Sequence, residues 1–214
     1  MAYRETQRVR ERKEQTRLAI LAAAAALVSA EKPVSMDAVA DGAGVSVGSL
    51  YSYFRNRREL LQALFDRRAA MELSAMGQAL HASQDPAVNL RNAAVLALRR
   101  ARRNPGMTLF LLLERMDRDA ALESAKMAYH RRHCEAFATV LRSAMADQRI
   151  PRRNPEVIAA AVLGLIIEIA IRALDPTNED PLSRLTPAEL EAEVGDTVLA
   201  TCGFALQDFT EVTI

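Results

Sequence analysis

The residues with the clearest chemical capacity lie in the stretch SVGSLYSYF, Ser46 to Phe54. Its serine and tyrosine hydroxyls can donate to and accept from phosphates and base edges, and Val47 can contact a thymine methyl group. Gly48 allows a close approach of the backbone. The stretch contains no Lys or Arg. We therefore expect it to contact DNA bases through hydroxyls and small apolar groups rather than through charge.

The surrounding segment, Ser35–Phe54, predicts two short helices joined by a turn. Ser35 and Ser46 are suitable N-caps, and Gly42 and Gly44 supply the turn. This is the layout of a helix-turn-helix, in which the second helix enters the major groove. Spacing alone leaves one alternative open: the glycines form an ordinary loop, and the tyrosines are partly buried aromatics.

Composition predicts an all-α chain. Half of the 214 residues are apolar, only 5% are aromatic, and Trp is absent. Residues 1–68 hold 12 Lys and Arg against 8 Asp and Glu, a net charge of +4, whereas residues 69–214 hold 16 against 19, a net of −3. A basic N-terminal part on a mildly acidic body is typical of a nucleic-acid-binding module with a second domain.

Helix caps and breakers predict nine helices and no strand. The expected helices are Arg8–Ser29, Ser35–Asp41, Ser46–Phe54, Arg57–Leu80, Asp85–Arg103, Met107–Met116, Ala120–Gln148, Asn154–Leu174 and Pro187–Leu206.

Two segments imitate export or membrane signals. Leu18–Val28 follows a basic stretch, as in a secretory signal, but acidic residues interrupt that stretch and we expect a supporting helix instead. Val157–Ile167 is apolar over eleven residues, short of the about 20 that span a bilayer. Cys134 and Cys202 have no CxxC spacing. We expect a cytoplasmic protein with no membrane contact and no disulfide framework.

Three stretches resemble the DNA-binding domain of the TetR family of bacterial transcriptional regulators. They are TRLAILAAAAAL (Thr16–Leu27), SMDAVADGAGVSVGSLYSYF (Ser35–Phe54) and NRRELL (Asn56–Leu61). The chain departs from the family pattern at Val28, where an aromatic is common, and at Arg58, where an acidic residue is frequent.

The resemblance implies two domains. Residues 1–56 are expected to form the helix-turn-helix domain, with a flexible arm at 1–8, and residues 57–214 a helical domain for effector binding and dimerisation. Basic side chains in and after the arm either reach DNA or are merely solvated. The DNA-contacting residues implied are Ser35, Ser46, Val47, Gly48, Ser49, Tyr51, Ser52, Tyr53 and Arg57.

In the family the last two long helices form the dimer interface. The last helix here carries apolar residues at spacings of four, and the preceding one is apolar nearly all round. A purely intramolecular core is the alternative. The interface residues expected are Ile158, Val162, Leu165, Ile169, Leu190, Val194, Val198 and Cys202.

An effector pocket is expected between Arg57 and Leu174. Glu168 needs a partner in an apolar helix, which is either Arg172 one turn on or a ligand. The candidate lining residues are Met76, Leu80, Leu96, Phe110, Leu113, Glu114, Met127, Tyr129, His133, Phe137 and Glu168. His130, His133 and Cys134 share one helix, but three local ligands are fewer than a metal usually needs, and we expect no metal and no cofactor.

Together these features predict a homodimeric regulator that binds a palindromic double-stranded DNA operator, most simply a repressor released by a small hydrophobic or amphipathic effector. No catalytic motif is present. The alternatives are a regulator without a small-molecule ligand and a helical small-molecule-binding protein.

Overall fold

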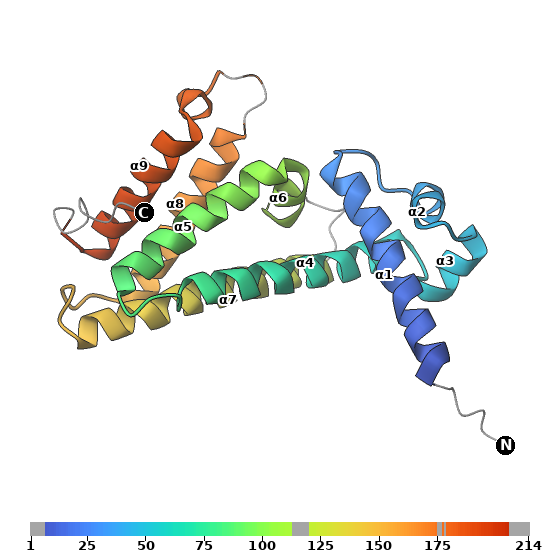
Figure 1. Ribbon diagram of the computed structural model, residues 1–214, viewed down its shortest axis with the longest axis horizontal. Coiled ribbons are helices and arrows are strands. Elements are labelled where there is room, and N and C mark those ends of the chain that lie inside the picture. Colours follow the sequence, from blue (N-terminus) through green and yellow to red (C-terminus); the bar gives the residue numbers. More distant parts are fainter. Residues whose placement is uncertain (1–6, 113–119, 175–176, 178, 206–214) are drawn as a thin grey trace. The chain divides into compact units, whose positions relative to one another are not determined.

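The computed structural model describes residues 7–112, 120–174, 177 and 179–205. Within these ranges the chain forms nine α-helices and one short 3-10 helix, with no strand (Figure 1). The all-α prediction is confirmed. The chain divides into two compact units, Met1–Arg68 and Ala69–Ile214.

The first unit contains α1 (Gln7–Ser29), α2 (Met36–Ala43), α3 (Val47–Tyr53) and the start of α4 (Arg57–Ala79). Ile20 of α1, Val39 of α2 and Leu50 of α3 are completely buried. Because each helix contributes an apolar side chain to this centre, the three helices stabilise one another although α2 and α3 are too short to be stable alone.

Gly42 lies inside α2 and not in the turn, contrary to the prediction. A Cβ atom there would lie 3.3 Å from the Cβ of Ala23, so the residue permits close packing of α2 on α1. Gly44 alone forms the turn, as the C-cap of α2 with φ of 66°. This left-handed conformation favours glycine because other residues meet a steric penalty there.

The boundary between the units falls within α4, at 68/69 rather than at the expected 56/57. Leu60, Leu61, Leu64 and Phe65 are almost completely buried on the N-terminal side of this boundary. None of them belongs to the hydrophobic cluster of the second unit. The first turns of α4 therefore complete the N-terminal unit, which a division at a loop does not anticipate.

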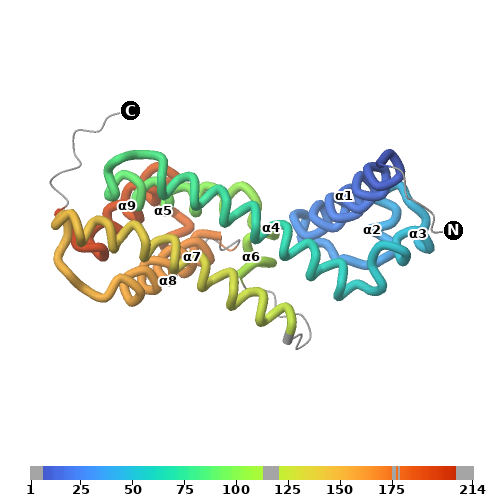
Figure 2. Tube along the Cα trace, turned by 90° about the horizontal axis from the view of Figure 1, so that it is seen from below, coloured from blue at the N-terminus to red at the C-terminus, as the bar shows by residue number. Residues whose placement is uncertain are grey.

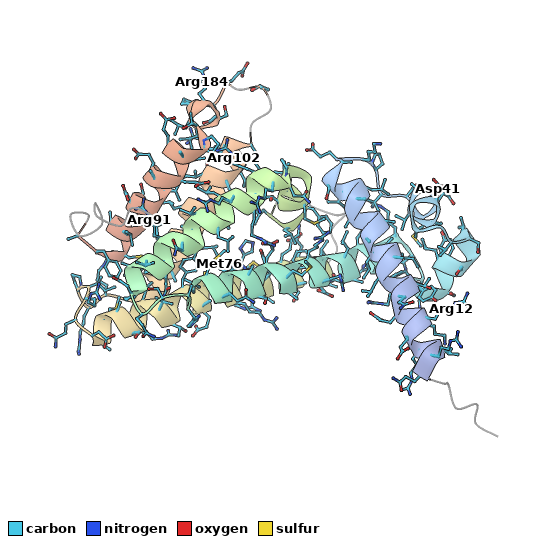
Figure 3. All side chains as sticks on the ribbon, viewed as in Figure 1. Arg12, Asp41, Met76, Arg91, Arg102 and Arg184 are labelled. Atoms are coloured by element: carbon cyan, nitrogen blue, oxygen red, sulfur yellow. The ribbon has the colours of Figure 1, made fainter. Side chains whose placement is uncertain are left out.

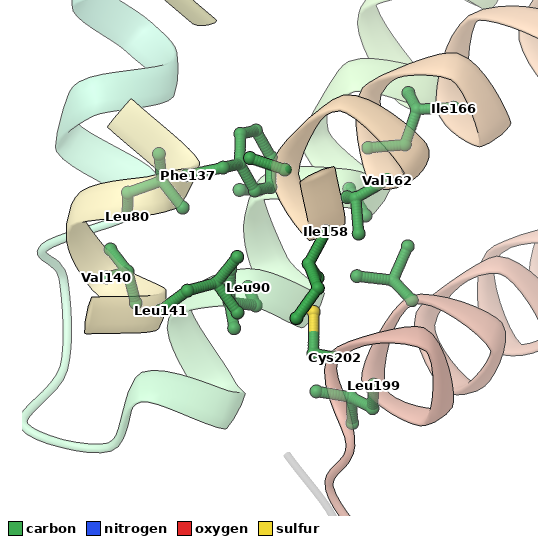
Figure 4. Close-up of a cluster of buried hydrophobic side chains, with 14 of the residues drawn as sticks. Leu80, Leu90, Phe137, Val140, Leu141, Ile158, Val162, Ile166, Leu199 and Cys202 are labelled. Atoms are coloured by element: carbon green, nitrogen blue, oxygen red, sulfur yellow. The ribbon is translucent and has the colours of Figure 1, made fainter. Parts of the chain in front are cut away.

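The second unit contains the rest of α4, then α5 (Pro86–Arg103), α6 (Pro105–Leu112), α7 (Ala120–Ala146), α8 (Pro155–Ala173), a 3-10 turn (Pro181–Arg184) and α9 (Pro187–Cys202). α7 runs alongside α8 (Figure 2), and α5 packs on α9. Phe137, Ile158 and Cys202 meet in the shared apolar core (Figure 4).

Proline and a capping side chain begin three of these helices. Asp85, Asn154 and Thr186 each accept a hydrogen bond from a backbone amide of the following turn. Thr186 also forms a reciprocal capping box with Glu189, which satisfies two amides that would otherwise lack partners.

α5 and α9 approach closely at Gly195. A Cβ atom at this position would lie 3.0 Å from the Cγ atom of Arg91. Arg91 lies between the two helices (Figure 3) and forms an ion pair with Asp196. The glycine therefore leaves room for the aliphatic part of Arg91 along α9. Among the described helices, none is both long and apolar enough to cross a membrane.

Candidate functional site

The outward face of α3 carries side chains that the first unit does not use for packing. Val47 is 38% exposed and Tyr51 48% exposed. A Cβ atom built on Gly48 would have no atom within 4 Å. Because glycine in a helix interior is less stable than alanine by about 0.5–1 kcal/mol, the fold itself gives no reason for glycine here. The side chain at the centre of this face is therefore small enough to allow a close approach to DNA.

The hydroxyls of α3 divide into two groups. Oγ of Ser46 accepts from the Ser49 amide at 3.1 Å, and Oγ of Ser52 donates to the Ser49 carbonyl at 2.6 Å. Ser49 and Tyr53 are half-buried, whereas the ring of Tyr51 is exposed. Tyr51 is therefore the hydroxyl best placed to reach outside the molecule, while Ser46 and Ser52 first serve the helix.

The opposite face of α3 fixes its orientation. Leu50 is completely buried and Phe54 nearly so, and the guanidinium carbon of Arg17 lies 5.4 Å from the centroid of the Phe54 ring. This arrangement combines apolar burial with a cation–π contact. Rotation of α3 would expose Leu50, so its outward face is fixed.

Ser35 and Arg57 lie close together at the start of α2. Nε of Arg57 donates to the Val34 carbonyl at 2.7 Å, and Oγ of Ser35 accepts from the Ala38 amide at 3.2 Å. Both residues are exposed. A helix N-terminus beside a guanidinium is a favourable place for a phosphate, in agreement with the role expected of this pair.

We expect Ser46→Ala to lower the free energy of unfolding of the first unit by about 1 kcal/mol, because it removes an N-cap. Hydrogen exchange at the Ser49 amide, which donates to Ser46, measures the effect. Ser52→Ala is the matched control, since its hydroxyl bonds only a carbonyl of its own helix. Equal protection of the Ser49 amide in both variants would contradict the capping role.

The segment that carries these features is similar to that of known regulatory proteins. Residues 20–64 match the sequence profile of the bacterial regulatory proteins, tetR family. Residues 20–64 therefore form a DNA-binding segment of the TetR type. The matched stretch contains α2, α3 and the buried part of α1, so it covers the candidate DNA-contacting surface.

Solved structures of transcriptional regulators and repressors show the same fold. A TetR/AcrR-family transcriptional regulator from Thermobifida fusca YX-ER1 matches with a TM-score of 0.69 and 19% identity, over 86% of this chain and 97% of the other. FadR from Bacillus subtilis, solved with stearoyl-CoA, gives 0.71 and 15% identity, over 86% and 98%. NalD from Pseudomonas aeruginosa, the secondary repressor of the MexAB-OprM multidrug efflux pump, gives 0.67 and 20% identity, over 89% and 97%.

Most of the residues predicted to form the dimer interface are buried within the chain itself. Val162, Val198 and Cys202 are completely inaccessible, and Ile158, Leu190 and Val194 nearly so. Leu165 and Ile169 pack against the same core. The spacing of four in α9 therefore marks a face that is buried within the chain, as in the intramolecular alternative. The six buried residues already pack inside the protomer, whereas Leu165 and Ile169 are only partly buried and stay predicted interface residues.

A different face of α8 is available for a partner. Val157 is 65% exposed, and Ala160, Ala161 and Gly164 are also exposed on successive turns. Sequence periodicity missed this face because α8 is apolar on all sides, so no polar stripe distinguishes outward from inward. Exposed small and apolar side chains on a helix are typical of a surface that another helix covers.

The predicted effector-pocket residues do not form one lining. Met76, Leu80 and Phe137 belong to the apolar core, and Phe110 is also buried. Met127 is 57% exposed and Glu168 is exposed, so these two do not face the interior. Leu96 is half-buried, and Leu113 and Glu114 lie outside the described residues. Tyr129 and His133 are buried side by side, with ring centroids 4.5 Å apart.

Arg172 pairs with Asp180 rather than with Glu168. Its Nε atom donates to the Asp180 carboxylate at 2.7 Å, and this contact is the main cause of the raised pKa of Arg172, with Glu168 a minor one. The intrahelical pair expected from spacing is therefore wrong. Glu168 needs no close partner because it is exposed to water.

A polar cluster gathers beside the core from α4, α5 and α7. Arg100 donates through Nε and an Nη atom to both carboxylate oxygens of Glu72, at 2.6 Å each. Glu72 acts electrostatically on Tyr129 and on His133. Burial is the main cause that raises the pKa of Tyr129 and lowers that of His133 to about 4. Both rings are therefore neutral at pH 7.

His133 makes the stability of the chain depend on pH. The pKa of His133 is lowered from 6.5 to about 4, chiefly by burial and then by the nearby His130, whereas Glu72 acts in the opposite direction. The other charged groups act through these two neighbours, since Lys126 acts on His130 and Arg100 pairs with Glu72. Below about pH 6.5 the unfolded state binds a proton there that the folded state excludes. Stability therefore falls between pH 6.5 and 4, by about 2–3 kcal/mol in total. Urea denaturation of the wild type and of His133→Phe across this pH range isolates the effect. If the free energy of unfolding changes equally with pH in both proteins, His133 is not the cause.

Metal binding gains no support from the described part of the chain. No group of three His, Cys, Asp or Glu side chains there is arranged to hold a metal ion. His133 and Cys134 are involved in packing, since His133 is buried and Cys134 borders the core.

Proposed function

We propose that this protein is a cytoplasmic transcriptional repressor of the TetR family that binds a palindromic DNA operator as a homodimer and leaves it when a small hydrophobic or amphipathic molecule binds. One observation carries the proposal: the outward face of α3 has a glycine, a valine and a tyrosine with no role in packing. A face of small and hydroxyl-bearing groups on the second helix of a helix-turn-helix suits the major groove.

The contacts proposed for DNA fall into two classes. Val47, Gly48 and Tyr51 meet base edges, with Ser49, Ser52 and Tyr53 beside them. Ser46, Ser35 and Arg57 meet phosphates near the N-termini of α3 and α2. Because α3 carries no cation, attraction to the backbone comes from residues outside it, of which Arg57 is the best placed.

Two copies are needed because one seven-residue helix reads few bases. In a dimer two recognition helices reach successive major grooves about 34–36 Å apart. The exposed face of α8, at Val157, Ala160, Ala161 and Gly164, supports association of two protomers through this helix.

The case for an effector rests on similarity and on the polar cluster of the second unit. The related FadR was solved with stearoyl-CoA, and the related NalD is a repressor of an efflux pump. In the proposed mechanism, an effector favours a dimer conformation whose recognition helices no longer match the spacing of the operator.

Selection of DNA from a random pool by the full-length protein tests the central claim. We expect a palindromic consensus, bound at moderate salt with a fluorescence-anisotropy signal that unrelated DNA of the same length does not give. Failure to enrich any sequence would overturn the proposal. If a consensus is bound but no small molecule releases it, the protein is a regulator without such a ligand.

A further inference from the structure

His133 is an unusual residue within the second unit. It is 6% exposed, and its Nε2 atom is fully buried with no hydrogen-bond partner in the described part of the chain. A buried polar atom without a partner destabilises the folded state, because it loses its hydrogen bonds to water. An apolar side chain would avoid this cost, so the packing of the protomer does not account for the imidazole.

The surroundings of His133 come from three helices. Its ring lies against that of Tyr129 on α7, with centroids 4.5 Å apart at an interplanar angle of 58°. The carboxylate of Glu72 on α4 acts on both rings, and Arg100 on α5 holds that carboxylate with two hydrogen bonds. The open Nε2 atom is therefore part of an ordered polar cluster inside the unit.

The cluster disfavours added charge of either sign. Burial lowers the pKa of His133, which means that a cation is unfavourable there. Burial also raises the pKa of Tyr129, with Glu72 contributing, which means that an anion is unfavourable beside it. Glu72 and Arg100 already neutralise each other through a bidentate pair. A partner for Nε2 is therefore favoured if it is polar and uncharged.

We propose that His133 recognises the effector, and that the group it binds is an uncharged hydroxyl on an otherwise apolar molecule. A hydroxyl can donate to Nε2 or accept from it, so it satisfies either tautomer of the neutral imidazole. The apolar remainder of the molecule would pack on buried apolar side chains of the same three helices, such as Met76, Ala101 and Phe137. This inference rests on the proposed function, because it identifies the ligand class to which the regulator responds.

Three probes with one eight-carbon chain and different head groups test the inference: 1-octanol, octanoate and octylamine. Their affinities for the full-length protein are measured by calorimetry at pH 7.5, with thermal unfolding in parallel. We expect 1-octanol to bind about tenfold more tightly than either charged probe, as one satisfied buried hydrogen bond would give.

Substitutions then assign the effect to His133. His133→Phe should weaken 1-octanol binding about tenfold while raising the Tm of the unliganded protein, because the unpartnered nitrogen is removed. His133→Gln keeps a donor and an acceptor and should preserve the order of the three probes. His81→Phe is the matched control: His81 is exposed in the turn that follows α4, and its loss should leave all three affinities unchanged.

Each contrary outcome overturns the inference. Strongest binding of octanoate would indicate an anion site that uses a cation such as Lys126, which acts on His130, in place of His133. Equal 1-octanol binding by wild type and His133→Phe, or no binding of any probe, would indicate that a buried water alone serves Nε2. Operator binding is also measured without any probe. Absence of operator binding counts against the proposed function, whereas operator binding combined with a contrary probe result counts only against the role of His133.

Discussion

Replacing Gly164 with arginine should convert the protein into a folded monomer whose affinity for a palindromic operator is about 10²–10⁴-fold lower, because two linked recognition helices bind with an avidity of that order. Gly164 is exposed on α8, and a Cβ atom there would have no atom within 4 Å. The protomer therefore accommodates the arginine. A second protomer covering this face would have to bury an unpaired charge, which is strongly unfavourable.

Light scattering after size-exclusion chromatography and anisotropy with the selected operator measure the two effects. Gly77→Arg is the matched control, because Gly77 also lies in a helix with open space around its Cβ position but outside the proposed interface. Circular dichroism confirms that both variants fold. A Gly164→Arg protein that remains dimeric would place the interface on another face.

Replacing Gly48 with leucine should separate stability from DNA binding. Leucine has a better helix propensity than glycine, which is about 0.8–1 kcal/mol less favourable than alanine, and no atom of the protomer lies within 4 Å of the new Cβ. Thermal unfolding should therefore occur at a higher temperature. On the operator, the side chain keeps α3 away from the base edges in both half-sites, which costs about 1–3 kcal/mol for each recognition helix, or at least about 30-fold in affinity.

Gly77→Leu is the control for the propensity gain, because it also replaces a helical glycine that has open space and should leave operator binding intact. Anisotropy with operator and with random DNA distinguishes lost base contacts from lost attraction to phosphates. If Gly48→Leu binds the operator as tightly as the wild type does, α3 does not approach the bases through Gly48.

The first unit could be predicted closely because its signals are local. Ser35 and Ser46 are the N-caps that the sequence indicated, and Leu50 and Phe54 face inward. Gly42 was misassigned because a glycine needed for close packing looks the same in sequence as one needed for a turn. Only the structure shows that Ala23 occupies the space beside it.

The second unit was harder to predict because its faces depend on neighbours distant in sequence. The stripe of α9 from Leu190 to Cys202 is real, but α5 and α8 cover it within the same chain. Similarly, Arg172 had two acidic residues within reach, and a residue eight positions away replaced the one expected. The ion pair between Glu72 and Arg100 joins α4 to α5, and its two residues are 28 positions apart in the sequence. No helical period predicts a contact at that separation.

The contact between α1 and α2 makes the helix-turn-helix sensitive to added volume. A Cβ atom at Gly42 would lie 3.3 Å from the Cβ atom of Ala23, which is closer than ordinary packing. A larger residue at either position must therefore displace one helix from the other, since packed interiors absorb added volume by displacement. Because α2 leads directly into the turn at Gly44, natural variation at this contact would act on the operator by shifting α3, and only a loss of volume at the partner position, such as Ala23→Gly beside a larger residue 42, would offset it.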